Sequence, residues 1–287
     1  MLTALQLQQQ RRRRAVPSLK QQYHEYILQR IESHKNSLSR RELLELGNEA
    51  VAEMEAAGDQ FLLTEVLLTD WVDRLIYKRL RLQPYGRWSK RFRQLRAAQR
   101  EPTHWGIDRR SPITRLLPRL EPGDAALVVG NDAAPLAYLL AAHDVEVIFT
   151  GSDMTFVDQV ESRVAEEALG HYCSTYVAPT CQCWPERPDR VQIVAIDTAT
   201  LEAETATTRR LIMERLIERT TPGGVHLILP SSRALAPDAF LSHYAEWTRE
   251  SPAPERRRPA KSLGILLGKP PEVVETGESV RSRDVPA

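Results

Sequence analysis

The spacing of apolar residues changes near residue 123, and this change limits the folds open to the chain. From Ser18 to about Gln99 apolar residues recur three and four positions apart, with almost no strand-like alternation. From Asp124 onward, short β-branched runs alternate with helical stretches, which is typical of a parallel sheet with crossover helices. A chain of 287 residues has room for two ordinary domains. We therefore expect an all-α unit followed by an α/β unit with a doubly wound, mostly parallel sheet.

Local signals mark the expected helices and strands. Ser18 follows Pro17 at the start of the first helix, and Ser39 with Glu42 has capping-box spacing. The expected helices cover residues 18 to at least 31, 39 to about 58, 61–80, 87–99, 135–142, 155–169 and 205–219, and the expected strands cover residues 125–129, 146–150, 175–178, 191–196, 225–229 and 262–267. The segment 61–80 has too many apolar residues for one stripe, so we expect a central buried helix there.

These elements divide the chain into five expected segments. They are a basic disordered arm (1–17), a helical domain (18–100), a linker with a short helix (101–122), the α/β domain (123–268) and a disordered tail (269–287). Charge follows the same division, because residues 1–122 carry a net charge of +9 and residues 123–250 a net charge of −10. Such asymmetry suggests that the first unit suits a polyanion or the acidic second unit.

The strongest charge run lies at the end of the helical domain. Between Arg74 and Arg100 there are ten Lys or Arg residues and no Asp or Glu. The candidates for nucleic-acid binding are Lys78, Arg79, Arg87, Lys90, Arg91 and Arg93, with nearby aromatic side chains available to stack on bases. Two alternatives stay open: a solvated helix face with Trp88 and Phe92 in the core, or docking on the acidic α/β unit. The helical domain could also carry a homo-oligomer contact.

Composition argues against several protein classes. No apolar run approaches the roughly 18 residues needed to span a bilayer, and the first ten residues are too polar for a signal-peptide core. Three cysteines are an odd number and too few to staple a chain of this length, which fits a reducing cytoplasm. We therefore expect a cytoplasmic protein. The chain has neither a Gly-rich phosphate loop nor a nucleophile elbow.

A zinc site can be considered from His171, Cys173, Cys181 and Cys183. A strand at 175–178 would hold the two pairs at opposite ends, about 26 Å apart at ~3.3 Å per residue, whereas tetrahedral zinc needs its sulfur ligands at ~2.3 Å. We therefore expect no metal, and we interpret the cysteines as small apolar core residues.

Four stretches of the α/β unit resemble class I S-adenosylmethionine-dependent methyltransferases, over about residues 111–268. They are LEPGD at 120–124 leading into ALVVGNDAAP, VEVIFTGSD at 145–153, VQIVAID at 191–197, and TPGGVHLIL at 221–229. The resemblance implies a Rossmann-like sheet with S-adenosylmethionine lying across the carboxyl ends of the first strands.

The same resemblance implies roles for individual residues. Gly130 and Asp132 would lie at the methionine end of the cofactor, and Asp153 would accept the ribose hydroxyls. Thr180 and Gln182 would lie near adenine, and Asp197 would face the methyl acceptor as a catalytic candidate. Two of these positions have simpler interpretations, because Asp153 could be a helix N-cap and Asp197 a loop carboxylate.

The first loop departs from the family pattern of an acidic residue followed by two or three glycines. Val128 occupies the acidic position, Asp132 and Ala134 replace glycines, and Gly130 remains. The sequence thus leaves two main functions open. One is an S-adenosylmethionine-dependent methyltransferase of unknown acceptor. The alternative is a catalytically inactive methyltransferase-fold protein that acts as a nucleic-acid-binding or protein-binding regulator. A structural subunit that dimerises through its helices is a third.

Overall fold

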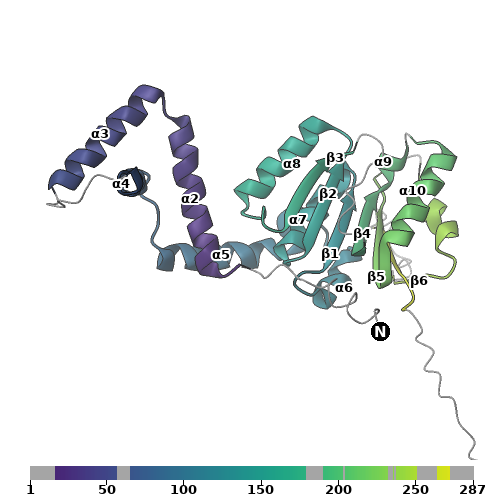
Figure 1. Cartoon of the computed structure of the whole chain (residues 1–287). Coiled ribbons are helices and arrows are strands. Elements are labelled where there is room, and N and C mark those ends of the chain that lie inside the picture. The colour runs from purple at the N-terminus through teal and green to yellow at the C-terminus, as the bar shows by residue number, and fades with distance from the viewer. Residues whose placement is uncertain are drawn as a thin grey trace, which may run out of the picture. The chain divides into compact units, whose positions relative to one another are not determined.

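A computed structural model describes residues 17–56, 65–178, 190–202, 204–231, 235, 237–250 and 264–271. The chain forms two compact units, divided between Ala97 and Ala98 (Figure 1). The expected arm at 1–17 and tail at 269–287 lie almost entirely outside the described residues. None of the described helices is long and apolar enough to cross a membrane.

The first unit is helical, as the sequence predicts. Its helices are α2 (Leu19–Ser37), α3 (Arg40–Ala56), α4 (Glu65–Arg79) and α5 (Tyr85–Gln99). The capping box is confirmed, because the Glu42 amide donates to Ser39 Oγ at 3.3 Å and the Ser39 amide donates to the Glu42 carboxylate at 2.7 Å. Helix α4 packs against both α2 and α3. Its buried apolar residues are Leu75 and Ile76, and several others are half-buried.

The second unit is built on a seven-stranded sheet with the order β3-β2-β1-β4-β5-β7-β6. The strands are β1 (Ala125–Val129), β2 (Glu146–Gly151), β3 (Cys173–Val177), β4 (Val191–Asp197), β5 (Thr220–Leu229), β6 (Thr248–Arg249) and β7 (Ile265–Gly268). Strands β1 to β5 pair in parallel, whereas β7 runs antiparallel to both of its neighbours. The doubly wound, mostly parallel sheet is therefore confirmed.

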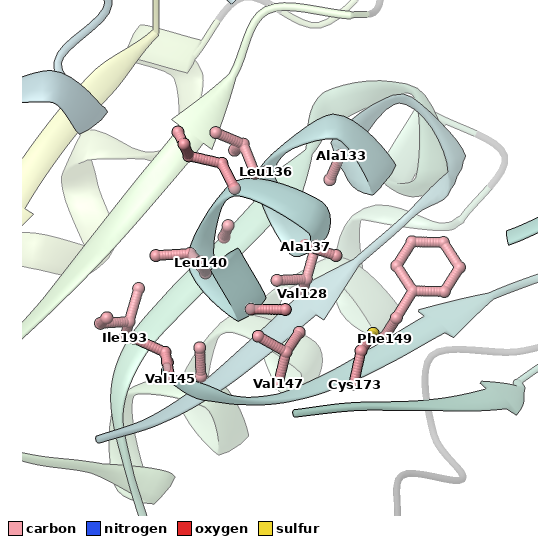
Figure 2. Close-up of a cluster of buried hydrophobic side chains, with 14 of the residues drawn as sticks. Val128, Ala133, Leu136, Ala137, Leu140, Val145, Val147, Phe149, Cys173 and Ile193 are labelled. Atoms are coloured by element: carbon pink, nitrogen blue, oxygen red, sulfur yellow. The ribbon is translucent and has the colours of Figure 1, made fainter. Parts of the chain in front are cut away.

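Helices cover both faces of this sheet. They are α6 (Ile113–Leu116), α7 (Ala134–Ala142), α8 (Met154–Glu166), α9 (Thr198–Glu202) and α10 (Ala206–Arg219), with short 3-10 segments η1 (Pro102–Trp105), η2 (Leu117–Arg119), η3 (Asn131–Ala133) and η4 (Pro237–Tyr244). Alternate residues of β1 enter two separate cores, because successive side chains of a strand point to opposite faces. Figure 2 shows the first core, where Leu136, Ala137 and Leu140 of α7 lie over Val128 and Val147.

The segment 101–122, which the sequence suggests as a linker, is packed into the α/β unit. Trp105, Ile113 and Leu116 belong to the first core. The Trp105 indole N–H donates to the Gln99 carbonyl at 2.7 Å, and the Gln99 side chain donates to the Glu167 carbonyl at 2.9 Å. Burial of this indole is thus accompanied by a hydrogen bond to its N–H, as buried tryptophans usually require. The compact unit therefore includes this segment and begins near residue 98, not at 123.

Candidate functional site

The carboxyl ends of β1 and β4 meet at the point where the strand order reverses (Figure 1). In open α/β sheets, ligands bind in the crevice outside these strand ends. Three residues that the sequence suggests come together here, namely Gly130 after β1, Asp132 in η3 and Asp197 at the end of β4. Thr180 and Gln182, the adenine candidates, lie outside the described residues.

Asp197 is the central polar group of this edge. Its residue is 1% exposed. One carboxylate oxygen accepts from the Thr200 amide at 2.7 Å, and the other accepts from the Asp132 amide at 2.9 Å. Burial raises the pKa of this carboxyl, although the hydrogen bonds oppose the change. The side chain therefore joins the loop after β1 to the start of α9.

Gly130 lies directly against this carboxylate. Its backbone has φ +100° and ψ 155°, a region that is essentially open to glycine alone. A Cβ at this position would overlap both the Asp197 carboxylate and the Thr200 hydroxyl. The side of Gly130 on which a Cβ would lie is therefore covered by side chains of the chain itself.

Asn131 of η3 and Gly151 at the end of β2 lie close together beside this edge. A Cβ on Gly151 would lie 3.0 Å from Asn131 Oδ1 and 2.9 Å from Val157 Cγ2, so Gly151 packs closely against η3 and α8. Asn131 Oδ1 is buried and has no hydrogen-bond partner among the described residues. Asn131, Gly151 and Thr200 are not among the residues that the sequence suggests. Gly151 directly follows the expected strand 146–150, and this position is the signal that could have identified it.

Asp153 lies two residues beyond β2 and caps α8. Its Oδ1 accepts from the Phe156 amide at 3.1 Å, and the residue is exposed. The N-cap interpretation is thus confirmed, while contact with ribose stays a prediction.

We expect Asp153→Ala to lower the free energy of unfolding of the α/β unit by about 1 kcal/mol, because the first turn of α8 loses its acceptor. Urea unfolding followed by circular dichroism measures the change. Asp153→Ser, which keeps a capping oxygen, is the matched control and should lose only a few tenths of this amount. Equal losses in both variants would contradict the capping role.

The six basic candidates fall into two groups. Lys78 contacts Glu53 at 2.9 Å, and Arg79 pairs with Glu49. Arg87, Lys90, Arg91 and Arg93 are exposed on α5. Trp88 is 8% exposed and stacks on Phe92 with ring centroids 4.7 Å apart. Trp88 is therefore buried, as that alternative expects, whereas Phe92 is half-buried.

The zinc candidates do not form a cluster within the described ranges. Cys173 is buried in β3, where burial raises the pKa of its thiol to about 12, and His171 is exposed. Cys181 and Cys183 lie outside the described residues. Among the residues that the structure does describe, no group of three or more His, Cys, Asp or Glu side chains could hold a metal ion.

Comparison with known proteins gives likenesses of fold. No protein-family model and no curated protein matches the chain. The N-methyltransferase NodS from Bradyrhizobium japonicum WM9 is similar at 14% identity and TM-score 0.46, over 57% of this chain and 95% of NodS. The methyltransferase CcbJ from Streptomyces caelestis is similar at 19% identity and TM-score 0.37, over 46% of this chain and 54% of CcbJ.

The glycopeptide N-methyltransferase MtfA, solved with S-adenosyl-L-homocysteine, is similar at 18% identity and TM-score 0.36, over 45% of this chain and 55% of MtfA. The chain thus spans about half the length of CcbJ and MtfA. The α/β unit has a doubly wound, mostly parallel sheet, as the resemblance to class I methyltransferases implies.

Proposed function

We propose that this chain is a methyltransferase-fold protein that acts by binding a partner and not by transferring a methyl group. The observation that carries the proposal is the position of the Asp197 side chain. It lies at the topological switch point, against the side of Gly130 where a Cβ would lie, and accepts two backbone amide hydrogen bonds there. The edge at which open α/β sheets bind ligands is therefore occupied on this side by a buried polar group whose hydrogen bonds are already made within the chain.

Displacement of the Asp197 side chain by a cofactor would cost free energy. A cofactor that displaced Asp197 would leave its carboxylate and the Asp132 amide without their partners. Each unpaired buried group costs roughly 1–3 kcal/mol, and more for a charged one. The loop itself offers little compensating space, since Ala134, one of the two residues that replace glycines of the family pattern, is buried.

A second candidate, a methyltransferase of unknown acceptor, is favoured by a different observation. Asn131 Oδ1 is buried beside Gly151 without a partner among the described residues, and such a group costs free energy unless a donor reaches it. A hydroxyl or amino group of S-adenosylmethionine could supply that donor. Gly130, Asn131 and Asp132 would then hold the cofactor, and the chain would contribute mainly by positioning the reactants.

Calorimetric titration of the full chain separates the two functions. We expect no binding of S-adenosylmethionine or S-adenosylhomocysteine at ligand concentrations up to ~1 mM, which corresponds to an affinity weaker than about −4 kcal/mol. The reason is that Asp197 occupies the side of Gly130 and already accepts the Asp132 amide. Circular dichroism on the same sample verifies that the protein is folded.

Saturable binding of either ligand below ~100 μM would overturn the proposal and favour the methyltransferase. In that case Asn131→Leu tests the orphan acceptor, because it should weaken binding by about 1–3 kcal/mol. Asn131→Asp is the companion variant, since it keeps an acceptor oxygen at the same position.

A further inference from the structure

We infer that the exposed face of helix α5 binds the phosphate backbone of a nucleic acid, without reading its bases. This surface, the α5 basic face, is defined by Arg87, Lys90, Arg91 and Arg93. It belongs to the helical unit, whereas Gly130 belongs to the α/β unit. The inference therefore stands whether or not the α/β unit binds a cofactor.

The basic side chains of α4 and α5 differ in whether an acidic side chain neutralises them. Lys78 and Arg79 of α4 are paired with Glu53 and Glu49 of α3, so their charges are largely neutralised. Across the part of the chain that the structure describes, the four side chains of the α5 basic face make no hydrogen bond or ion pair. No acidic residue occurs between residues 74 and 100 to offset them. Unpaired cations on a surface are what a phosphate backbone neutralises.

The four side chains of the α5 basic face are closely spaced along the helix. Arg87, Lys90 and Arg91 are related by three and four residues, and such positions are neighbours on one helix face. They span about 6 Å of rise. Arg93 lies three residues beyond Lys90 but only two beyond Arg91, so at about 100° per residue it points roughly 160° away from Arg91. The result is a broad band of positive charge on the exposed side of the helix, which suits successive phosphates better than a single small anion.

The packing of α5 does not fit an amphipathic membrane helix. Such a helix must bury an apolar face in the lipid interface. The opposite face of α5 is already used within the unit: Trp88 stacks on Phe92, and its ring centroid lies 5.3 Å from that of Tyr23 in α2. Tyr26 of α2 also contacts Trp88, at 5.9 Å. Because the apolar face is occupied, charge alone remains to bind a partner.

The same packing predicts binding without base readout. The aromatic rings of α5 contact one another and α2, and the Tyr23 hydroxyl also donates to the Gln83 carbonyl at 3.0 Å. Rings held in this way are poorly placed to stack on bases, which is how aromatic side chains recognise single strands. Affinity should therefore vary little with base sequence.

The test compares two double variants of the full chain that each remove two positive charges. Arg87→Gln/Arg91→Gln alters the α5 basic face, whereas Lys78→Gln/Arg79→Gln alters the paired cations of α4. Fluorescence anisotropy follows binding to a labelled mixed-sequence DNA duplex of about 20 base pairs from ~50 to ~200 mM salt. With four phosphate contacts the native affinity should fall about 100-fold over this range.

The two variants should then differ clearly. Arg87→Gln/Arg91→Gln should reduce the fall to about 10-fold and weaken binding at the lowest salt, because two contacts are lost. Lys78→Gln/Arg79→Gln should keep the native salt dependence. A second duplex of different sequence should bind with affinity within about threefold, since phosphate contacts carry no sequence information.

Three outcomes would overturn the inference. One is no binding by the native chain at ~50 mM salt, which reduces the α5 basic face to a solvated surface. Another is equal weakening by both double variants. The third is binding to vesicles of phosphatidylcholine with about one third phosphatidylserine, lost in Arg87→Gln/Arg91→Gln, without binding to the duplex. None of these readouts depends on S-adenosylhomocysteine, so failure here is distinct from failure of the proposed function.

Discussion

Replacing Gly130 with alanine is expected to lower the free energy of unfolding of the α/β unit by about 2–6 kcal/mol. Two effects add. The backbone at φ +100° and ψ 155° is strained by roughly 1–3 kcal/mol for a residue with a Cβ. The new methyl group would also overlap the Asp197 carboxylate and the Thr200 hydroxyl, and overpacking of this kind typically costs about 1–3 kcal/mol.

Urea unfolding of Gly130→Ala and a matched glycine variant measures this effect. Gly170→Ala is the control in the same unit, because a Cβ there meets no atom within 4 Å and its φ is not positive. It should change stability by no more than about 1 kcal/mol. If Gly130→Ala is as stable as Gly170→Ala, the close approach of Asp197 to Gly130 is wrong.

A double-mutant cycle with Asp197→Ala separates the two contributions at Gly130. Removing the carboxylate should recover part of the steric cost of Gly130→Ala, but not the backbone strain. The coupling between the two positions is therefore expected to be favourable and on the order of 1–3 kcal/mol. Absence of coupling would place the whole cost in the backbone, and Asp197 would not be the group that closes the crevice.

Much of the architecture could be predicted because it follows from local periodicity. Helical spacing in the first unit and short buried runs in the second identify α2 to α5 and the parallel strands. The two-residue strand β6 and the antiparallel direction of β7 could not be predicted. Their pairing depends on backbone hydrogen bonds to distant strands, and so short a strand shows no period of its own.

The segment 101–122 shows where composition misleads. Its charged and proline-containing sequence is typical of a linker, yet Trp105 and Ile113 are buried in the first core. The sequence does contain the bulky apolar residues, but not the partners that satisfy the indole N–H and anchor the turn. Those partners come from Gln99 and, through its side chain, from Glu167.

The site was predictable in its location and not in its packing. Strand ends after β1 and β4 are recognisable, so Gly130, Asp132 and Asp197 could be assigned to one edge. Whether Asp197 points to solvent or to Gly130 depends on which amides it reaches in three dimensions. The role of Asp153 depends in the same way on where β2 ends. The strand ends at Gly151, and Asp153, two residues later, caps α8.

The α/β unit is expected to lose stability in acid because of His226. This residue of β5 is fully buried, and its ring contacts Tyr244 of η4. The Thr220 hydroxyl donates to the Leu216 carbonyl at 2.7 Å, so it must accept from His226 Nε2, 2.6 Å away. His226 Nδ1 then accepts from the Tyr244 hydroxyl at 2.7 Å. This arrangement requires a neutral imidazole with its proton on Nε2.

Burial, with a smaller contribution from the positive charge of Lys269, lowers the pKa of His226 to about 3. In the unfolded chain the pKa returns to about 6.5. Below that value the unfolded state binds one proton more than the folded state, so stability is full above about pH 6.5 and falls as the pH decreases toward 3. The expected loss from this residue is about 1.4 kcal/mol for each pH unit in that window.

Urea midpoints measured from pH 7.5 to about pH 4 test this dependence in the native chain and in His226→Gln. Glutamine can donate and accept hydrogen bonds but does not titrate. The variant should therefore be less stable at neutral pH, because its shape fits the site less well, and lose stability less steeply on acidification. Other groups titrate equally in both proteins, so the difference between the two slopes isolates His226. Parallel pH profiles would show that His226 is not the buried neutral base described, and acid sensitivity would then belong to the carboxylates.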